Sequence, residues 1–508
     1  MIIPKEVKFI INELRVNSFE AYIIGGCVRD ILRGVEPNDW DITTNANPKK
    51  ISEIFSSPLQ SPNKEFGAVK SFTDNKFGTV AVLTGSKNPA LKEIEITPYR
   101  VESKYSDKRH PGEIKWAKTI EQDLSRRDFT VNAMAIKLPD AKSAESYHLR
   151  TDIVDIFNGQ KDLENKIIRA VGSPEERFDE DALRLMRATR LATTLGKAWK
   201  IEAKTLSAIK KSACSLKLIS KERIKDELMK IIMSEQAKDG IELLRTLNLL
   251  KEIIPELEEG YGVGQNKHHK YDVYEHNLRC LEYAAKKNFS KYVRISALLH
   301  DIAKPRVKQG DGPDSTFYNH EVVGAKMTTK ILNNLKFSNK DIEKITKLVR
   351  FHLFYYNVGE VSDSSVRRLV YKVGLENMEE LLQLRMCDRI GSGCPKAEPY
   401  KLRHLKYLIE KVSQDPISVA TLNVDGKEII KLLKIKPGPK IGQILDILLG
   451  YVLSEPEKNK KEILKKEVEK LGILSDENLE KLAQKARKER EKIEIKKDEM
   501  TKKKYWVT

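Results

Sequence analysis

Residues 22–48 read YIIGGCVRDILRGVEPNDWDITTNANP, and this stretch decides the fold of the N-terminal part of the chain. A short apolar run ends at Gly25 and Gly26, and a helical pattern that contains Arg29 begins there. Glycine at a strand-to-helix junction lets a phosphate approach the backbone, and the first amides of a helix suit a triphosphate. Glycine also occurs at such junctions for packing alone, so both interpretations stay open at this point.

Two acidic residues, Asp39 and Asp41, follow the helical pattern. Residues i and i+2 of a strand face the same side, and two carboxylates there repel unless a cation lies between them. Mg²⁺ takes carboxylate and phosphate oxygens together, and two-metal phosphoryl transfer places one ion at the attacking hydroxyl and one at the triphosphate. A third carboxylate is expected on a neighbouring strand, and Glu95, which alternates with Ile94 and Ile96, is the best candidate. A surface Asp-x-Asp in a turn is the alternative.

Strand and helix patterns divide the chain into two kinds of segment. Residues 1–155 mix short alternating runs with helical patterns, and later segments repeat apolar residues every three or four positions. We therefore expect an α+β fold in which a mixed-sheet head is followed by an all-α neck, body and tail. The expected boundaries are 1–155, 156–235, 236–400 and 401–508.

Composition narrows the class of protein. The 508 residues include 92 Lys and Arg against 74 Asp and Glu, a net charge of +18. This excess favours polyanionic partners, nucleic acid first, although a lysine-rich proteome would produce it as well. The 5 cysteines are far apart and form no Cys-x-x-Cys pair. That argues against a disulfide framework or a thiolate zinc site and for the cytoplasm. No apolar run approaches the roughly 18 residues that span a bilayer.

Six motifs in order resemble the bacterial and eukaryotic class of tRNA nucleotidyltransferases, the CCA-adding enzymes and their poly(A) polymerase relatives, within the superfamily of DNA polymerase β. The motifs are GGCVRD at 25–30 with DWD at 39–41, FGT at 77–79, EITPYR at 95–100, DLSRRDFTVNAMA at 123–135, RFDEDALRLMRATRLA at 177–192 and SKERIKDEL at 220–228. The resemblance implies a polymerase β-like head that uses Mg²⁺. It also implies that CTP and ATP are joined to the 3′ end of tRNA as CCA, with release of pyrophosphate.

The resemblance further implies that EDALR at 180–184 reads the incoming base. Cytosine and adenine both present an amino donor beside a ring-nitrogen acceptor, whereas uracil and guanine present a carbonyl in place of the amino group. A carboxylate at Asp181 and a guanidinium at Arg184 would therefore select C and A. The two residues stand at i and i+3, adjacent on one expected helix face, where an ordinary ion pair is the alternative. Arg187 and Arg190 continue this stripe and are expected to reach the triphosphate or to stack under the base.

By the same resemblance, the nucleotide's phosphates and ribose are held by Gly26, Arg29, Arg127 and Asp128. Residues 104–118 resemble the flexible loop of CCA-adding and A-adding members. Within this loop, Asp107, Arg109 and His110 are expected to move when specificity switches from CTP to ATP, and a mobile surface loop is the alternative. The neck, 177–235, carries 14 Lys and Arg against 8 Asp and Glu, which suits the acceptor stem of tRNA.

A second set of metal-ligand residues lies in the body. Most of them sit in apolar helical context, where a buried polar group needs a partner. Imidazole and carboxylate ligands together suit Mn, Ni, Fe or Zn better than Ca. The ordered set resembles the HD-domain metal phosphohydrolases, and the resemblance implies one divalent metal, a transition metal or Mg²⁺, and a possible second one. The first metal would be bound by His276, His300, Asp301 and Asp388, and the second site would be completed by His320 and His352. Whether this body hydrolyses phosphates or only binds tRNA stays open.

Three alternatives to a CCA-adding enzyme remain at this stage. The first is an A-adding enzyme or a poly(A) polymerase. The second is a phosphohydrolase whose head only binds RNA. The third is a non-enzymatic tRNA-binding protein, which the Asp-x-Asp and Glu-Asp-x-x-Arg motifs together disfavour. The oligomeric state is not indicated by the sequence.

Overall fold

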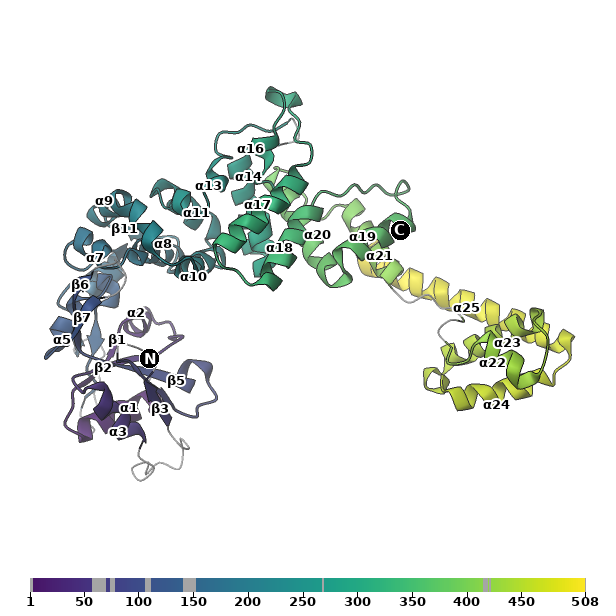
Figure 1. The fold of residues 1–508 in the computed structure, drawn as a ribbon, viewed down its shortest axis with the longest axis horizontal. Helices are drawn as coiled ribbons and strands as arrows, with labels where there is room; N and C mark the ends of the chain where they lie inside the picture. Colours follow the sequence, from purple (N-terminus) through teal and green to yellow (C-terminus); the bar gives the residue numbers. More distant parts are fainter. Residues whose placement is uncertain are drawn as a thin grey trace. The chain divides into compact units, whose positions relative to one another are not determined.

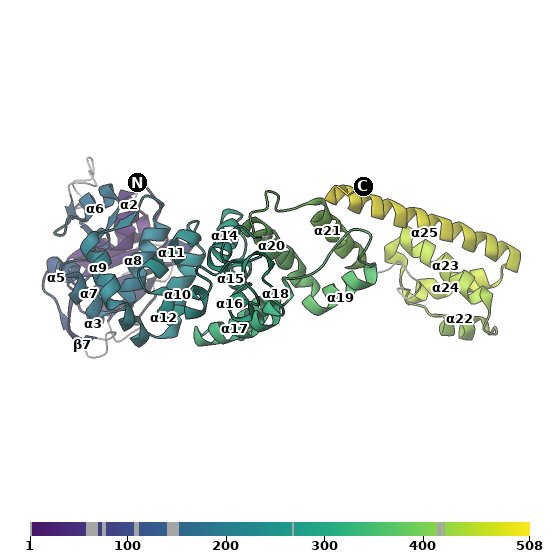
Figure 2. The same cartoon turned by 90° about the horizontal axis from the view of Figure 1, so that it is seen from above.

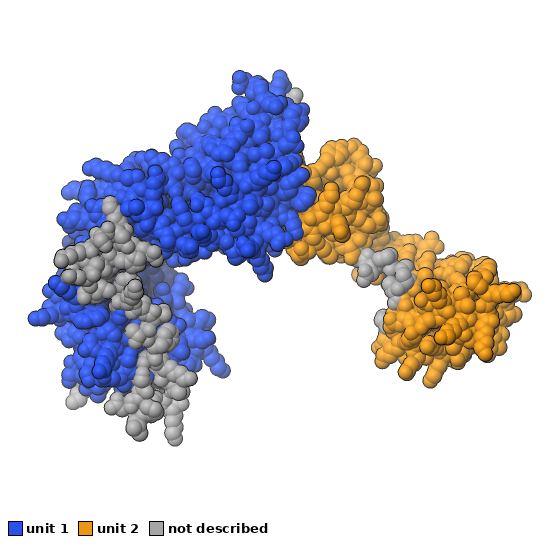
Figure 3. Space-filling model, in the orientation of Figure 1, with its two compact units in different colours: residues 1–352, 383–394 blue, residues 353–382, 395–508 orange. Residues whose placement is uncertain are grey.

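The computed structural model describes residues 3–56, 70–73, 78–105, 111–139, 152–266, 269–413, 419 and 422–507. The chain forms two compact units, residues 1–352 with 383–394 and residues 353–382 with 395–508 (Figure 3). Within the described ranges, no helix is long and apolar enough to cross a membrane. The expected α+β class is confirmed, and the four domain boundaries stay a prediction.

The head of the first unit is built on a mixed β-sheet. Over its described residues the sheet has 7 strands in the order β3-β4-β5-β2-β1-β8-β9 (Figure 1). The strands are β1 Ala21–Ile24, β2 Asp41–Thr44, β3 Lys70–Thr73, β4 Val80–Leu83, β5 Glu93–Pro98, β8 Ala135–Ile136 and β9 Ile153–Val154. Strands β2 and β5 run parallel and the other neighbours run antiparallel.

One face of this sheet is apolar and packs against helices. The helices are α1 Lys5–Val16, α2 Gly26–Leu32 and α3 Pro48–Ser56. Val28 of α2 and Ile51 of α3 share one core cluster with Ile42 of β2. Because successive strand residues face opposite sides, the polar residues that alternate with this core lie on the other face.

The other elements of the head surround the sheet. A hairpin is formed by β6 Arg100–Tyr105 and β7 Pro111–Trp116. The three loop residues expected to move, Asp107, Arg109 and His110, lie outside the described residues. The remaining short helices of the head are α4 Pro89–Lys92, α5 Ile120–Ser125 and η1 Thr130–Asn132.

The rest of the first unit is helical apart from a small parallel pair, β10 Ile167–Ile168 and β11 Lys200–Ile201 (Figure 2). Its first helices are α6 Gly159–Asn165, α7 Pro174–Glu180, α8 Leu183–Thr194, α9 Ala203–Ser212, η3 Ala213–Leu218, α10 Lys221–Ile232, α11 Ala237–Thr246, α12 Leu250–Ile253 and α13 Pro255–Glu258. Then come α14 Val273–Lys286, α15 Lys291–Leu299, α16 Lys304–Val307, η4 Gly312–Asp314, α17 His320–Asn334, α18 Asn339–Phe351 and the end of α20 Leu375–Gly391. One hydrophobic cluster runs from Phe129 to Val349, so the neck and the body share a core.

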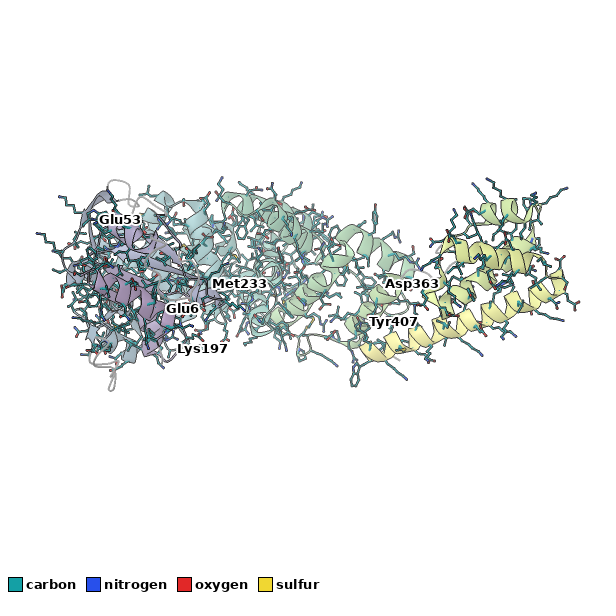
Figure 4. All side chains as sticks on the ribbon, turned by 90° about the horizontal axis from the view of Figure 1, so that it is seen from below. Glu6, Glu53, Lys197, Met233, Asp363 and Tyr407 are labelled. Carbon is teal, nitrogen blue, oxygen red and sulfur yellow. The ribbon has the colours of Figure 1, made fainter. Side chains whose placement is uncertain are left out.

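The second unit is also helical. It contains the start of α20 together with α19 Asp363–Val373, α21 Tyr400–Ser413, α22 Gly426–Leu433, α23 Pro439–Ser454, η6 Pro456–Lys458, α24 Lys461–Gly472 and α25 Asp476–Tyr505. The long helix α25 packs against both α23 and α21. Tyr407 of α21, labelled in Figure 4, donates a hydrogen bond to Asp498 of α25. The Lys504 ammonium lies 2.6 Å from Glu410. These contacts hold the end of α25 against α21.

Candidate functional site

Three predicted carboxylate residues lie together at strands β2 and β5. Asp41 begins β2 and stands in parallel register with Glu95 of β5. Asp39 lies in the bend just before β2 and is exposed, whereas Asp41 is half-buried, so the expectation that both belong to one strand is corrected although their carboxylates are close enough to interact. Burial and the charge of Asp39 raise the pKa of Asp41 to about 7, with Glu95 adding to the rise and Arg127 opposing it. A divalent cation would relieve this repulsion.

The glycine turn faces this carboxylate cluster. Gly25 has a φ of +84°, and a Cβ there would lie 2.9 Å from Arg127 Nη1 and 3.6 Å from Asp41 Oδ2. A side chain at position 25 would strain the backbone and displace the guanidinium beside the carboxylates. Gly26 begins α2, where a Cβ would lie 3.6 Å from Arg29 Nη2. The structure therefore brings Gly25 and Arg127 together beside Asp41, and Arg29 lies at the adjoining Gly26.

A chain of hydrogen bonds links α2, η1 and α8 behind this turn. Arg29 donates to the side-chain oxygen of Asn132 at 2.7 Å, and the Asn132 amide donates to Asp128 at 3.2 Å. Asp128 also forms an ion pair with Arg187 of α8 at 2.6 Å. Burial opposes ionisation, but the guanidinium groups of Arg187 and Arg184 hold the pKa of Asp128 well below its usual range. Asp128 is therefore ionised next to Arg127.

Asp181 does not share a helix with Arg184, which corrects the expectation of one helix face. Its backbone is extended (φ −142°, ψ 105°) in the break between α7 and α8, whereas Arg184 lies in the first turn of α8. The Asp181 carboxylate accepts a hydrogen bond from the backbone N–H of Leu183 at 3.0 Å. Aspartate competes in this way with continued helix, so the break has a local cause.

Both base-reading candidates are held by partners from elsewhere in the fold. Asp181 pairs with Arg223 of α10 at 2.7 Å. Arg184 is buried, pairs with Glu180 and donates to the backbone oxygen of Arg126 at 3.0 Å. The last contact ties α8 to the segment that carries the arginine of the carboxylate cluster. One further predicted residue, Arg190, pairs with Glu227 of α10 at 2.7 Å.

The six predicted ligand residues of the body meet around Asp301. Nε2 of His276 lies 3.1 Å from Nε2 of His300, 3.2 Å from Asp301 Oδ2 and 3.6 Å from Asp388 Oδ1. All four of these residues are buried. They come from α14, from the end of α15 and from α20, so the fold gathers residues that lie far apart in sequence.

The other oxygen of Asp301 faces the second pair of histidines. Nε2 of His320 lies 3.3 Å from Nε2 of His352, and the two nitrogens lie 3.4 Å and 3.7 Å from Asp301 Oδ1. Asp301 thus stands between two groups of donor atoms. If two cations were bound here, both groups of donor atoms would share the Asp301 carboxylate.

Backbone carbonyls decide which ring nitrogen of these histidines carries the proton. Nδ1 of His300, His320 and His352 lies 3.0, 2.7 and 2.7 Å from the carbonyl oxygen three residues earlier. A carbonyl only accepts, so Nδ1 bears the hydrogen and Nε2 presents a lone pair. Burial lowers the pKa of His300 to about 3 and also lowers that of His320. Neutral rings whose lone pairs face each other repel, and a divalent metal would relieve this, so the donor set fits a metal.

Cationic side chains approach the two carboxylates of this cluster. The Lys304 ammonium lies 2.7 Å from Asp301 Oδ2 and 2.7 Å from Gln265 Oε1. Arg385 forms an ion pair with Asp388, and although burial opposes it, this arginine holds the pKa of Asp388 well below its usual range. The Asp388 carboxylate is therefore ionised and able to bind a cation.

Sequence reasoning did not single out several partner residues of these networks, among them Lys304, Asn132 and Arg223. Lys304 follows Asp301 by three and Asn132 follows Asp128 by four, so their spacing is a visible local signal. Arg223 carries no local signal, because its partner Asp181 lies 42 positions away.

Three family models match parts of the chain. Residues 21–169 match the poly A polymerase head domain, and residues 199–260 match the probable RNA and SrmB-binding site of polymerase A. Residues 319–468 match the putative tRNA nucleotidyltransferase domain 2.

Curated relatives match over most of the chain. The A-adding tRNA nucleotidyltransferase of Deinococcus radiodurans is 32% identical over 444 residues, 84% of this chain and 90% of the relative. The CCA-adding enzyme of Pediococcus pentosaceus is 30% identical over 467 residues, 92% of this chain and 98% of the relative. Among solved structures, the Bacillus stearothermophilus CCA-adding enzyme in complex with CTP is 24% identical, with a TM-score of 0.57, covering 92% of this chain and 98% of that one. The last match confirms the fold.

Proposed function

The chain belongs to the tRNA nucleotidyltransferases, and from that premise we propose that it adds CCA to the 3′ end of tRNA from CTP and ATP, releasing pyrophosphate. The observation that carries this proposal is the carboxylate cluster of Asp39, Asp41 and Glu95 beside Arg127 and the glycine turn. The free cysteines fit a cytoplasmic location, which is part of the proposal.

In the proposed reaction the three carboxylates hold Mg²⁺. In this two-metal reaction, one bound ion would neutralise charge on the triphosphate and the other would make the attacking 3′-hydroxyl more acidic. Arg127 and Arg29, at the glycine turn, bind the triphosphate. The ionised Asp128 accepts a hydrogen bond from the ribose 2′-hydroxyl, which favours NTP over dNTP.

We assign base selection to Asp181 and Arg184, with Arg187 and Arg190 beside the triphosphate. Asp181 accepts from the amino group that cytosine and adenine share, and Arg184 donates to the adjacent ring nitrogen. Arg223 orients the Asp181 carboxylate, and Glu180 with the Arg126 carbonyl orients the Arg184 guanidinium.

Addition of A alone is the alternative within the family, since the relatives include both kinds of enzyme. The test uses a tRNA transcript that lacks CCA and a transcript that ends in CC, each with one NTP. We expect CTP to be added to the first and ATP to the second. Addition of ATP to the second transcript, with no addition of CTP to the first, would establish A-adding activity instead.

A second function is favoured by the histidine lone pairs that face each other in the body. We propose that His276, His300, Asp301 and Asp388 hold one divalent cation, and that His320 and His352 share Asp301 with a second. Such cations, when bound, act as Lewis acids toward a phosphate ester. Lys304, beside Asp301, adds positive charge for an anionic substrate.

Paired variants separate the two functions. Asp39→Ala with Asp41→Ala is expected to abolish nucleotide addition and to leave hydrolysis of a 2′,3′-cyclic nucleotide unchanged. Asp301→Ala is expected to have the opposite effect. Nucleotide addition that survives the double change would refute the Mg²⁺ assignment.

A further inference from the structure

A buried thiol adjoins the histidine cluster of the body. Cys280 follows His276 by one turn of α14, is 0% exposed, and its Sγ lies 3.5 Å from His276 Nε2. The donor atoms of His276, Cys280 and His300 all lie within 4.8 Å of one another. The sulfur is therefore at the cluster.

The usual reason for a buried cysteine is that it packs as a small apolar side chain. Cys280 is fully buried like its helix neighbours Leu278 and Leu281. Its sulfur also contacts the His276 ring and meets the end of α20 at Gly391. The sulfur therefore lies beside donor atoms of the cluster in addition to being part of the packed interior.

The close approach of α20 to α14 fixes where this sulfur lies. A Cβ at Gly391 of α20 would stand 2.3 Å from Cys280 Sγ and 3.0 Å from the His276 carbonyl oxygen. Only glycine leaves room for the sulfur at its observed position. The chain therefore accommodates the thiol beside His276 at the end of the helix that also supplies Asp388.

The spacing of the donor atoms matches that of ligands around one cation. Metal–nitrogen distances of about 2.1 Å and metal–sulfur distances of about 2.3 Å place neighbouring ligand atoms roughly 3.0–3.7 Å apart. His276 Nε2 lies 3.1 Å from His300 Nε2 and 3.2 Å from Asp301 Oδ2. It lies 3.5 Å from Cys280 Sγ, which is within the same interval.

We propose that Cys280 is a sulfur ligand of the cation held by His276, His300, Asp301 and Asp388. On binding, the thiol releases its proton to solvent and the sulfur donates a lone pair, with no change of oxidation state. A thiolate with two imidazoles selects a borderline transition metal such as Zn²⁺, Co²⁺ or Fe²⁺ over Mg²⁺. The proposal rests on the cation site of the proposed second function and is independent of nucleotide addition by the head.

The test is cobalt substitution of the full-length protein after removal of metals with a chelator. Wild type is expected to bind Co²⁺ and to show the near-ultraviolet band of sulfur-to-cobalt charge transfer. Cys280→Ser should retain visible cobalt absorption but lose that band, and should lower Zn²⁺ affinity on the order of tenfold. Cys387→Ser, which alters a second buried thiol on α20, is the matched control and should keep the band.

Two outcomes would overturn the proposal, and they differ. If wild type binds Co²⁺ without the sulfur band, or if Cys387→Ser removes it, the sulfur assignment is wrong while the cation site stands. If wild type binds no Co²⁺, the cation site and its sulfur ligand are both wrong. Nucleotide addition by the same sample reports on the head separately.

Discussion

At the scale of single residues, we expect a proton and the proposed Mg²⁺ to compete for Asp41. Its pKa is raised from 3.8 to about 7 because it is buried beside Asp39. Since the folded value exceeds the unfolded one, the metal-free protein should lose stability as the pH rises through this interval. The carboxylate must be ionised to hold Mg²⁺, so protonation below the raised pKa competes with metal binding.

The first prediction concerns this competition. The Mg²⁺ concentration for half-maximal CTP addition should rise by roughly tenfold for each pH unit below about 7, and should change little above it. It is measured from initial rates between about pH 6 and about pH 8. The Mg²⁺ affinity of free CTP over the same pH range is the control. If the Mg²⁺ concentration for half-maximal addition changes with pH only as much as the Mg²⁺ affinity of free CTP does, the prediction is wrong.

The second prediction concerns Arg223, which we describe as a positioning residue for Asp181. Replacing Arg223 by Met removes the 2.7 Å ion pair that holds the Asp181 carboxylate. We expect kcat/KM for CTP and ATP to fall about tenfold, or about 1.4 kcal/mol. We also expect discrimination against UTP to weaken, which a purely structural role would not produce.

The control for this experiment is Arg306→Met. It removes an exposed ion pair with Glu259 at 2.6 Å, far along the chain from the base-reading residues. Its kcat/KM values should match wild type. Unchanged discrimination against UTP in the Arg223 variant would show that Asp181 does not depend on this partner.

These residues also show where sequence reasoning succeeds and fails. Two-metal chemistry predicts a third carboxylate beside Asp41, and strand alternation selects Glu95 for it, because strand geometry dictates which residues share a face. The pairing of Asp181 with Arg223 joins residues 42 positions apart, and no local pattern reports such a contact. Cys280 follows His276 by four residues on one helix, so the sequence carries a local signal for this pair, but cysteine spacing alone does not reveal it.

At the scale of elements, the end of α20 closely approaches α14. Gly391 lies at the contact, where a methyl group would meet the Cys280 sulfur and the His276 carbonyl. A larger side chain at residue 391 would push α14 and α20 apart, and the residues of the histidine cluster on these helices would move with them. The position of Asp388 relative to His276 therefore depends on residue 391 being a glycine, which has no side chain.

The third prediction is that Gly391→Ala destabilises the protein by about 1–3 kcal/mol and weakens metal binding by the body. Denaturant unfolding of the metal-free protein measures the first effect, and metal content after dialysis measures the second. Adding Cys280→Ala should recover part of the stability, because it removes the closest contact. If Gly391→Ala had the same unfolding midpoint in denaturant as wild type, this explanation of the packing would be wrong.

Gly442→Ala is the matched control. Gly442 lies in α23, and a Cβ there would meet no atom within 4 Å. Alanine favours a helix interior over glycine by about 1 kcal/mol, so this change should be neutral or stabilising. Because the two glycine-to-alanine changes should alter the free energy of unfolding in opposite directions, their comparison separates the packing effect at Gly391 from the effect of helix propensity.

The boundary between α7 and α8 also shows what local sequence patterns can and cannot predict. The pattern of EDALRLMRATRLATTL predicts continuous helix from 180, but the structure ends α7 at Glu180 and begins α8 at Leu183. Apolar periodicity persists across the break because both helices bury residues in the same core. The hydrogen bond from the Leu183 N–H to the Asp181 carboxylate favours a break at this point. The spacing of apolar residues does not indicate such a break.

At the scale of the whole molecule, the first unit contains both candidate sites, and one core joins the helices between them. The expected boundary at residue 235 stays a prediction, and buried residues on both sides of it pack into one hydrophobic cluster. Helical periodicity does not report such shared packing, because periodicity is a local signal.

The fourth prediction follows from the net charge of +18. Each tRNA phosphate that the protein contacts releases condensed cations, so the affinity for tRNA should fall steeply as salt rises. The incoming CTP offers only one triphosphate, which is already matched with Mg²⁺, so its KM should rise much less. Steady-state CTP addition at several KCl concentrations, with each substrate varied in turn, gives both slopes on logarithmic axes. Equal slopes would mean that the basic surface does not bind the tRNA backbone and that the charge excess has another origin.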